Sequence, residues 1–265
     1  MGSILEKYGI KEVADICFYT IGADGKPGNP VLFIDTAKTS TTETSADSVY
    51  AQGGKGNPRL IGWDFNKNIT LNLEDALFTM KSMALMYGAL GNEVKGSSTG
   101  TIRKTIEYVA TDTTVPTEYK WTDINGNQQT ASNIEIYDQN GVKVTDVLVK
   151  GTKYYMTFTV AAKTQEIRIS PDRFPGTYYI CCDTFCRSEA NGMDDYFQLI
   201  IPKGKITSDT TLTLEADGDP TVFSMAIDVL RAKDEDGQNI MMKLVKYGFE
   251  GEGNTGDGNI KLVEN

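Results

Sequence analysis

Residues 206–230 read ITSDTTLTLEADGDPTVFSMAIDVL, and this stretch decides the fold class. Apolar residues stand at every second position from 212 to 216 and again from 223 to 229. Such alternation is typical of strands that have one buried face and one wet face. The break between the two runs, Asp217–Pro220, consists of residues that favour turns. We therefore predict a long antiparallel hairpin, and its sequence contains no cluster of nucleophiles, bases or metal ligands.

Short runs of the same kind recur along the chain, separated by turn signals. Strands are expected near residues 13–21, 31–35, 60–65, 69–73, 101–110, 134–137, 142–149, 154–160, 166–169, 178–182, 195–201 and 240–247. Asn140-Gly141 lies between two of these runs and is a strong short-range signal for a hairpin. Many short strands with regular turns predict a mainly β protein, an antiparallel β-sandwich or barrel.

One helix is predicted, over residues 73–87, flanking the β-sandwich. Asn72 is a suitable N-cap, and Asp75 stands at the capping-box position three residues later. Apolar residues from Ala76 to Tyr87 recur at spacings of three and four, which indicates one apolar face. This face is methionine-rich and favours packing against a sheet over a groove for a partner. Gly88 is expected to end the helix.

The charge and the residue types argue against several functions. The formal net charge is −10, so the chain repels nucleic acid on average and sequence-specific binding is not expected. An acidic wall would still let a polyanion slide past without sticking. The chain has no histidine, which removes the commonest general base and zinc ligand. We expect no enzyme activity, no catalytic residues, no cofactor and no metal.

Two weaker patterns could still support chemistry. Cys181, Cys182 and Cys186 lie close together and Cys17 stands apart, but the spacing lacks the pairs of a zinc site. Buried free thiols are the favoured interpretation, with a redox or metal role as the alternative. Acidic pairs such as Asp217 and Asp219 are explained as turn residues more readily than as calcium ligands.

The sequence also bears on where the protein is found. No apolar run approaches the roughly 20 residues that span a bilayer, so no membrane anchor is expected. The first residues lack the basic and apolar segments of a secretory signal. A product made in the cytoplasm is the expectation.

Residues 36–58 form the chain's most unusual segment, because they are small, polar and long for a loop. Gly53-Gly54-Lys55-Gly56 invites a phosphate-loop interpretation. However, the spacing is wrong, and a strand follows where a helix N-terminus is needed. A mobile turn is the simple alternative. The more specific hypothesis is a β-hairpin arm that becomes ordered against a neighbouring subunit.

Two blocks of sequence resemble a known family. Residues 50–64 read YAQGGKGNPRLIGWD and are followed by Asp75-Ala76-Leu77 and an apolar helix. Residues 197–230 contain Ile201-Pro202-Lys203-Gly204-Lys205 and then LEADGDPTVFSM. Together they resemble bacteriophage tail tube proteins (major tail proteins) over about residues 10–250. The block between them, about residues 112–190, departs from compact members of the family and indicates extra strands.

The resemblance implies a structural virion protein that assembles with itself. Six copies would close into a ring, rings would stack into a tube, and viral DNA would pass through the lumen without specific binding. The tail sheath, the tape measure protein and the baseplate are the other partners implied. The protein would be made in the host cytoplasm and located in the virion tail. The alternatives are a β-sandwich decoration or baseplate and adhesion module, and a carboxylate-dependent enzyme.

The family's inter-ring arm maps onto residues 36–58 of this chain. The interface residues expected in and beside this arm are Thr39, Thr42, Tyr50, Gln52, Lys55 and Arg59. The expected domain organisation has four parts. They are residues 1–111, the first part of the tube-like core; 112–190, an inserted β region; 191–250, the closing strands of the core; and 251–265, a loose tail.

Overall fold

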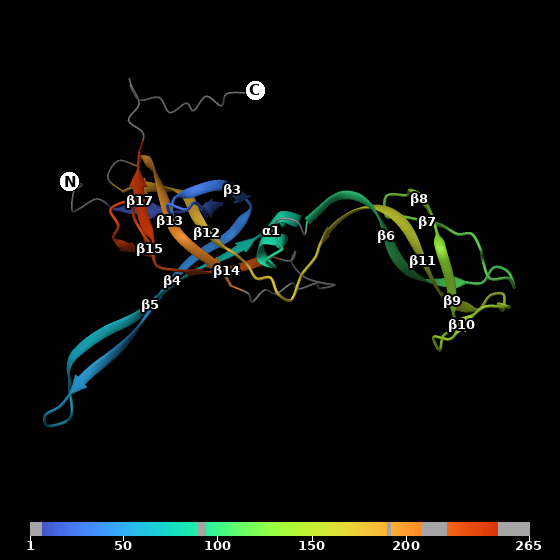
Figure 1. The fold of residues 1–265 in the computed structure, drawn as a ribbon, viewed down its shortest axis with the longest axis horizontal. Coiled ribbons are helices and arrows are strands. Elements are labelled where there is room, and N and C mark those ends of the chain that lie inside the picture. The colour runs from blue at the N-terminus through green and yellow to red at the C-terminus, as the bar shows by residue number, and fades with distance from the viewer. Residues whose placement is uncertain (1–6, 90–93, 190–191, 208–221, 249–265) are drawn as a thin grey trace, which may run out of the picture. The chain divides into compact units, whose positions relative to one another are not determined.

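The structure is a computed structural model that describes residues 7–89, 94–189, 192–207 and 222–248. The chain divides into two compact units (Figure 1). The first combines Met1–Gly91 with Ile169–Asn265, and the second is Asn92–Arg168. All strand pairings are antiparallel, and the one helix described is short. The expected mainly β, antiparallel fold is confirmed.

The first unit is built on one nine-stranded sheet. Its strands are β1 (Tyr8–Ile10), β2 (Asp15–Ile21), β3 (Pro27–Ile34), β4 (Ala37–Gln52), β5 (Arg59–Asp75), β12 (Thr177–Ser188), β13 (Asp194–Ile206), β14 (Phe223–Val229) and β17 (Lys243–Tyr247). The path runs β3-β2-β12-β13-β14-β5-β4, with β1 paired to β12 and β17 paired to β13. A separate ladder joins β15 (Ala232–Lys233) to β16 (Asn239–Ile240). The described strands form an open sheet and no closed barrel.

One face of this sheet forms the core of the first unit. The alternating positions of its strands supply side chains that are fully buried, among them Ile16, Phe18, Ile180, Ile201 and Ile227. Burying each such side chain contributes about 1.5–3 kcal/mol. The period-two pattern of the sequence therefore determines which face of the sheet is covered.

The stretch quoted first is part of this sheet. Met225, Ile227 and Val229 are buried, as the alternation predicts. β14 pairs on one side with the end of β13, through Ile206 opposite Ile227, and on the other side with β5. The expected strand near residues 211–216 and its turn lie outside the described residues, as does the expected tail at 251–265.

The helix prediction over residues 73–87 is wrong at its start. Residues up to Asp75 belong to β5, because Leu71 and Leu73 are buried at period-two spacing between β4 and β14. The helix, α1, is Met80–Met86, and Thr79 is its N-cap. Thr79 and Ser82 form a reciprocal capping box, with hydrogen bonds of 2.9 and 3.0 Å.

Gly88 ends the helix as expected. It has a φ of +67°, its N–H donates to Leu85 O, and the N–H of Ala89 donates to Ala84 O. These two bonds form a Schellman motif, which requires a left-handed residue at this position. Leu85 and Met86 pack into the core of the sheet, which confirms that the helix packs on the sheet.

We expect Gly88→Ala to destabilise the protein more than Gly25→Ala. Both glycines have positive φ, which costs an L-residue about 1–2 kcal/mol. A Cβ at Gly88 would also lie 2.4 Å from the carbonyl carbon of Phe174, whereas none of the structure lies within 4 Å of a Cβ at Gly25. Thermal unfolding followed by circular dichroism measures the difference. Equal losses of stability would contradict the close packing at Gly88.

The second unit has its own strands and its own core. A four-stranded sheet has the order β10-β9-β11-β6, and a hairpin pairs β7 with β8. Their bounds are β6 (Val94–Val109), β7 (Lys120–Thr122), β8 (Gln128–Thr130), β9 (Ser132–Tyr137), β10 (Lys143–Val144) and β11 (Lys153–Ile167). Ile136, Met156 and Phe158 are fully buried in this core. The predicted Asn140-Gly141 hairpin is present, with Gly141 at φ +78° between β9 and β10.

The bounds of this unit differ from the inserted region expected at residues 112–190. β6 belongs to the unit because it pairs along its length with β11, from Val109 opposite Lys153 to Val94 opposite Ile167. β12 does not belong, because it pairs with β2 and β13 in the first unit. The chain therefore enters and leaves the second unit on two paired strands.

Candidate functional site

The hairpin of β4 and β5 is the longest ladder of the first unit, and its outer half extends away from the core (Figure 1). Beyond Ser45 and Asn68, no residue of the hairpin is buried. A two-stranded ribbon without a covering layer is only marginally stable in water. The ribbon, which we call the arm, comprises residues 46–67 and turns at Gly53–Pro58.

One face of the arm is apolar. Val49 lies opposite Trp63, and Ala51 lies opposite Ile61, so their side chains share a face. Phe65 is on the same face, where it lies opposite Asp47, the one charged residue of this face. About half of each large side chain is exposed: 52% for Val49, 55% for Ile61, 52% for Trp63 and 48% for Phe65. We call these four residues the apolar strip, and exposed contiguous apolar surface of this kind marks an interaction site.

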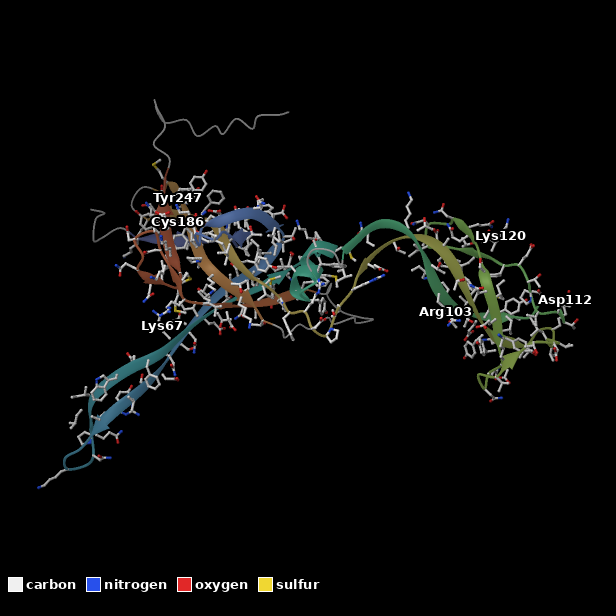
Figure 2. All side chains as sticks on the ribbon, viewed as in Figure 1. Lys67, Arg103, Asp112, Lys120, Cys186 and Tyr247 are labelled. Atoms are coloured by element: carbon white, nitrogen blue, oxygen red, sulfur yellow. The ribbon has the colours of Figure 1, made fainter. Side chains whose placement is uncertain are left out.

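A bulge in β5 determines which way the strip faces. The register shifts between Ser45 opposite Asn68 and Asp47 opposite Phe65, so β5 contains one extra residue at Asn66–Lys67. Asn66 has a positive φ of 51°. In a regular strand of the same sequence, Phe65 and Trp63 would lie on the same face as the buried Leu71. Figure 2 labels Lys67 at this point, where the arm leaves the body of the unit.

The opposite face of the arm holds three of the residues predicted from the sequence. The guanidinium carbon of Arg59 lies 4.1 Å from the ring centroid of Tyr50. Gly62 lies beneath this ring, since a Cβ there would be 3.0 Å from a ring carbon. Asn57 Nδ2 donates to Gln52 Oε1 over 3.2 Å. Tyr50, Gln52 and Arg59 therefore lie together near the tip, and Lys55 is in the turn itself.

The other two predicted residues are not part of this group. Thr39 and Thr42 lie at the base of the hairpin, where Thr39 is opposite Glu74 and Thr42 is opposite the buried Leu71. The hairpin also includes residues beyond the expected boundary at 58, because β5 supplies its second strand.

The base of the hairpin has a polar outer face, which we call the polar wall. It covers three adjacent strands, β4, β5 and β14, on the side away from the core. Cross-strand pairing places on it Thr39, Thr41, Glu43 and Ser45; Asn68, Thr70, Asn72 and Glu74; and Ser224, Ala226 and Asp228. The wall is made of small polar side chains and three carboxylates. Lys205, opposite Asp228 on β13, stands at its border.

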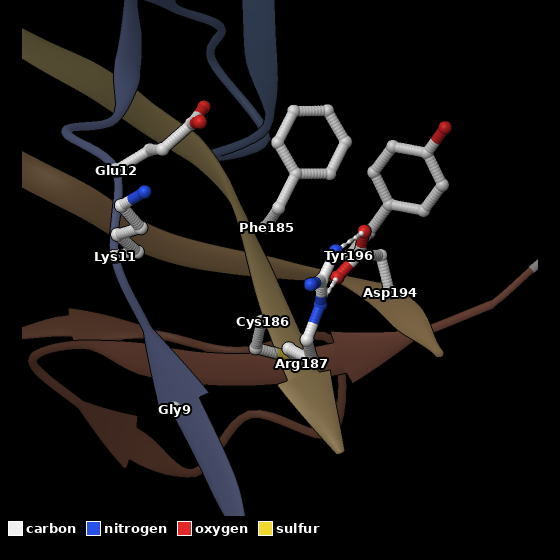
Figure 3. A pocket seen from close by; sticks show the side chains of 8 residues that line it. All are labelled: Gly9, Lys11, Glu12, Phe185, Cys186, Arg187, Asp194 and Tyr196. Atoms are coloured by element: carbon white, nitrogen blue, oxygen red, sulfur yellow. Dashed lines mark hydrogen bonds and ion pairs between the residues drawn. The ribbon is translucent and has the colours of Figure 1, made fainter. Parts of the chain in front are cut away.

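A cavity of about 650 Å³ lies where β1 meets β12 and β13 (Figure 3). Arg187 forms two hydrogen bonds of 2.6 Å with the carboxylate of Asp194, and this ion pair lowers the pKa of Asp194. The rings of Phe185 and Tyr196 lie 5.2 Å apart. The arginine and the aspartate satisfy each other, and Lys11 and Glu12 line the same cavity.

Two of the four thiols are held in the protonated form; of the four, Cys182 and Cys186 are buried and Cys17 and Cys181 are half-buried. Burial raises the pKa of Cys182 to about 12 and that of Cys181 to about 11, so both are protonated at neutral pH. Among the described residues, no cluster of three or more acidic, cysteine or histidine side chains could hold a metal ion. No described helix has the length and apolar character needed to cross a membrane.

The sequence of the chain matches a known protein family over most of its length. Residues 8–243 match the YomU/Tube protein family. The chain belongs to this family. Membership in the YomU/Tube family confirms the resemblance to tail tube proteins and fits a structural protein of the phage virion. Comparison with curated proteins gave no match.

The sequence interpretation did not identify the apolar strip of this tube-family protein. Residues 61, 63 and 65 alternate with polar or small residues, which predicts a strand over 60–65 and does not indicate what covers its apolar face. Their partner Val49 lies in a polar segment and gives no periodic signal. The alternation of Ile61, Trp63 and Phe65 next to the long polar segment was the available signal.

Proposed function

We propose that the chain is the repeating subunit of a phage tail tube. Copies close into six-membered rings, the rings stack, and viral DNA passes through the common channel. The ring size and the channel come from the resemblance to tail tube proteins. The observation that carries the proposal is the β4–β5 hairpin, which has an uncovered apolar strip on its arm and a polar wall at its base.

The arm supports stacking between rings. Its apolar strip has no covering layer in the described chain, and burying a large apolar side chain contributes about 1.5–3 kcal/mol. A copy in the adjacent ring is the natural cover for the arm, because every ring of the stack would offer an equivalent surface to the ring beside it. Repetition along the tube would then cover every arm except those at one end.

The edges of the sheet support closure within a ring. β3 and β4 end the strand order of the first unit, and β4 has no strand partner except β5 among the described residues. A long unpaired strand edge is a template for pairing with another chain. Head-to-tail pairing of such edges closes into a ring when the rotation between neighbours is right. Ring formation thereby removes exposed edges.

The polar wall supports the passage of DNA. Threonine, serine and asparagine side chains present hydroxyls and amides, and Glu43, Glu74 and Asp228 add negative charge. Carboxylates repel phosphate, so DNA would slide along such a surface instead of binding to it. We propose that this wall faces the channel.

Electron microscopy of the purified full-length chain over a range of concentrations tests this function. We expect hollow rings that stack into tubes as the concentration rises, because each added ring covers another set of arms. Chains that stay monomeric or trimeric at all concentrations, while circular dichroism shows folded β structure, would overturn the proposal.

One observation favours a second function. The unit Asn92–Arg168 has its own core and connects to the rest of the chain through two paired strands. This organisation suits a module for decoration or adhesion. The same microscopy separates the two functions, because a decoration protein would not form tubes by itself.

A further inference from the structure

The second unit contains a cleft of about 340 Å³ beneath the β7–β8 hairpin. Its apolar lining residues are Trp121, Ile102, Val160, Ala161 and Ala162. Its polar side chains are Lys104, Lys163, Gln129 and Asp123. We propose that this cleft binds an anionic saccharide, a sugar that carries a carboxylate or a phosphate.

The cleft is held in place by the core of the unit. The ring of Tyr119 lies 5.3 Å from that of the fully buried Phe158, which fixes the hairpin on the sheet. The N–H of Ala131 donates to Tyr119 O over 2.9 Å and extends the pairing. Trp121 lies directly opposite Gln129 across the hairpin and packs partly against the core. The indole and the amide are therefore positioned before any ligand arrives, which reduces the entropy lost on binding.

The carboxylate of Asp123, which lines the cleft, accepts its hydrogen bonds from the turn between β7 and β8. Asp123 Oδ1 accepts the N–H groups of Asn125 and Asn127 over 2.9 and 2.8 Å, and Oδ2 accepts Asn127 Nδ2 over 3.2 Å. The hydrogen bond from the backbone of Asn127 is the main cause of the lowered pKa of Asp123. This carboxylate shapes the turn and has little capacity left for a ligand.

The two lysines remain as donors. Lys104 Nζ lies 5.0 Å from the ring centroid of Trp121, and neither Lys104 nor Lys163 forms an ion pair with a described residue. The charged residues that line the cleft, Lys104, Lys163 and Asp123, sum to +1. Lys104 carries the ammonium beside the indole, because alternation along β11 places Lys163 on the face opposite Val160 and Ala162. A cationic cleft in a chain of net charge −10 selects an anion.

The mixture of groups defines the ligand class. An indole and an aliphatic floor suit the C–H face of a sugar ring, and Gln129 can both donate to and accept from hydroxyls. The ammoniums form charge-assisted hydrogen bonds with a carboxylate or phosphate. The volume is at the lower end of the range of ligand pockets, about 300–1,000 Å³. A short acidic oligosaccharide fits these properties, and this binding does not depend on tube assembly.

Isothermal titration calorimetry on the full-length chain tests the proposal. The probes are trigalacturonate, its neutral counterpart galactotriose, mannose 6-phosphate and oligothymidylate. We expect an acidic probe to bind at least about tenfold more tightly than galactotriose, because only the acidic probe pairs with the lysines. Preference for trigalacturonate or for mannose 6-phosphate tells carboxylate from phosphate recognition, and either supports the proposal.

Variants of the cleft complete the test. Lys104→Gln should weaken binding of the acidic probe about fivefold or more, and Trp121→Phe should also weaken it, because the indole covers the sugar face. Lys150→Gln, an exposed lysine of the same unit outside the cleft, should change nothing. Three results would overturn the proposal: no binding of either acidic probe, equal binding by Lys104→Gln and the unaltered chain, or tightest binding of oligothymidylate.

Discussion

Replacement of Trp63 by aspartate is expected to stop the stacking of rings and to leave the subunit folded. Trp63 is at the centre of the apolar strip, opposite Val49 and between Ile61 and Phe65. Aspartate would place a charge where a neighbouring copy excludes water, and an unpaired charge in a buried interface costs several kcal/mol. The side chain is half exposed in the single chain, so the fold of the subunit loses little.

The matched control is Leu60→Asp. Leu60 is also an exposed apolar residue of the arm, at 63%, but it lies outside the strip. Both variants carry the same change of charge. We expect tubes from Leu60→Asp, whereas Trp63→Asp should give single rings or free subunits by electron microscopy and sedimentation velocity. If both variants form tubes, or both fail, the strip is not the specific contact.

Period-two alternation predicted the parts of the fold that depend on burial. Met225, Ile227 and Val229 are buried because a strand with one apolar face can be covered only on that face. The hairpin at Asn140-Gly141 followed from local chemistry, since Gly141 takes a positive φ that few other residues accept. In both cases the information lies within a few consecutive residues.

The errors have a different origin. Asn72 and Asp75 have the spacing of a capping box. However, Leu71 and Leu73 pair with β4 on one side and β14 on the other, and this tertiary pairing outweighs the local signal. The true cap, Thr79 with Ser82, has a serine where the pattern calls for glutamate or glutamine. The bounds of the second unit also depend on distant pairing, between β6 and β11.

In the candidate site too, the features that depend on consecutive residues were predicted, and those that depend on contacts with distant parts of the chain or with other copies were not. The sequence located the arm through its unusual length and composition, and the structure gives it as a hairpin. The role of Ile61, Trp63 and Phe65 could not be predicted, because alternation indicates that a face is to be covered but not what covers it. The bulge at Asn66 and Lys67 decides that this face is not continuous with the core. The strip residues of β5 and the buried residues after the bulge all have odd numbers, so the sequence alone indicates one continuous face.

The polar wall leads to the second large effect, which concerns the release of DNA. In the proposed tube, Glu43→Lys would line every ring with cations where carboxylates now stand. Lysines neutralise phosphates and release their counterions, so they bind DNA with an affinity that falls steeply as salt rises. We therefore expect particles with normal tails that release DNA about tenfold more slowly at low salt, with recovery as salt is added.

Two substitutions isolate this effect of charge. Glu43→Gln keeps the size of the side chain without the positive charge, and it should release DNA at close to the normal rate. Asp146→Lys makes the same change of charge in the second unit, which supplies no residue of the wall, and should also leave release unchanged. Release is followed by the fluorescence of a DNA-binding dye after triggering of purified particles.

If Glu43→Lys and Asp146→Lys behave alike, the wall does not face the channel. If Glu43→Lys prevents tubes from forming, the wall is instead a contact between subunits, because a lysine facing an open lumen would not disturb assembly.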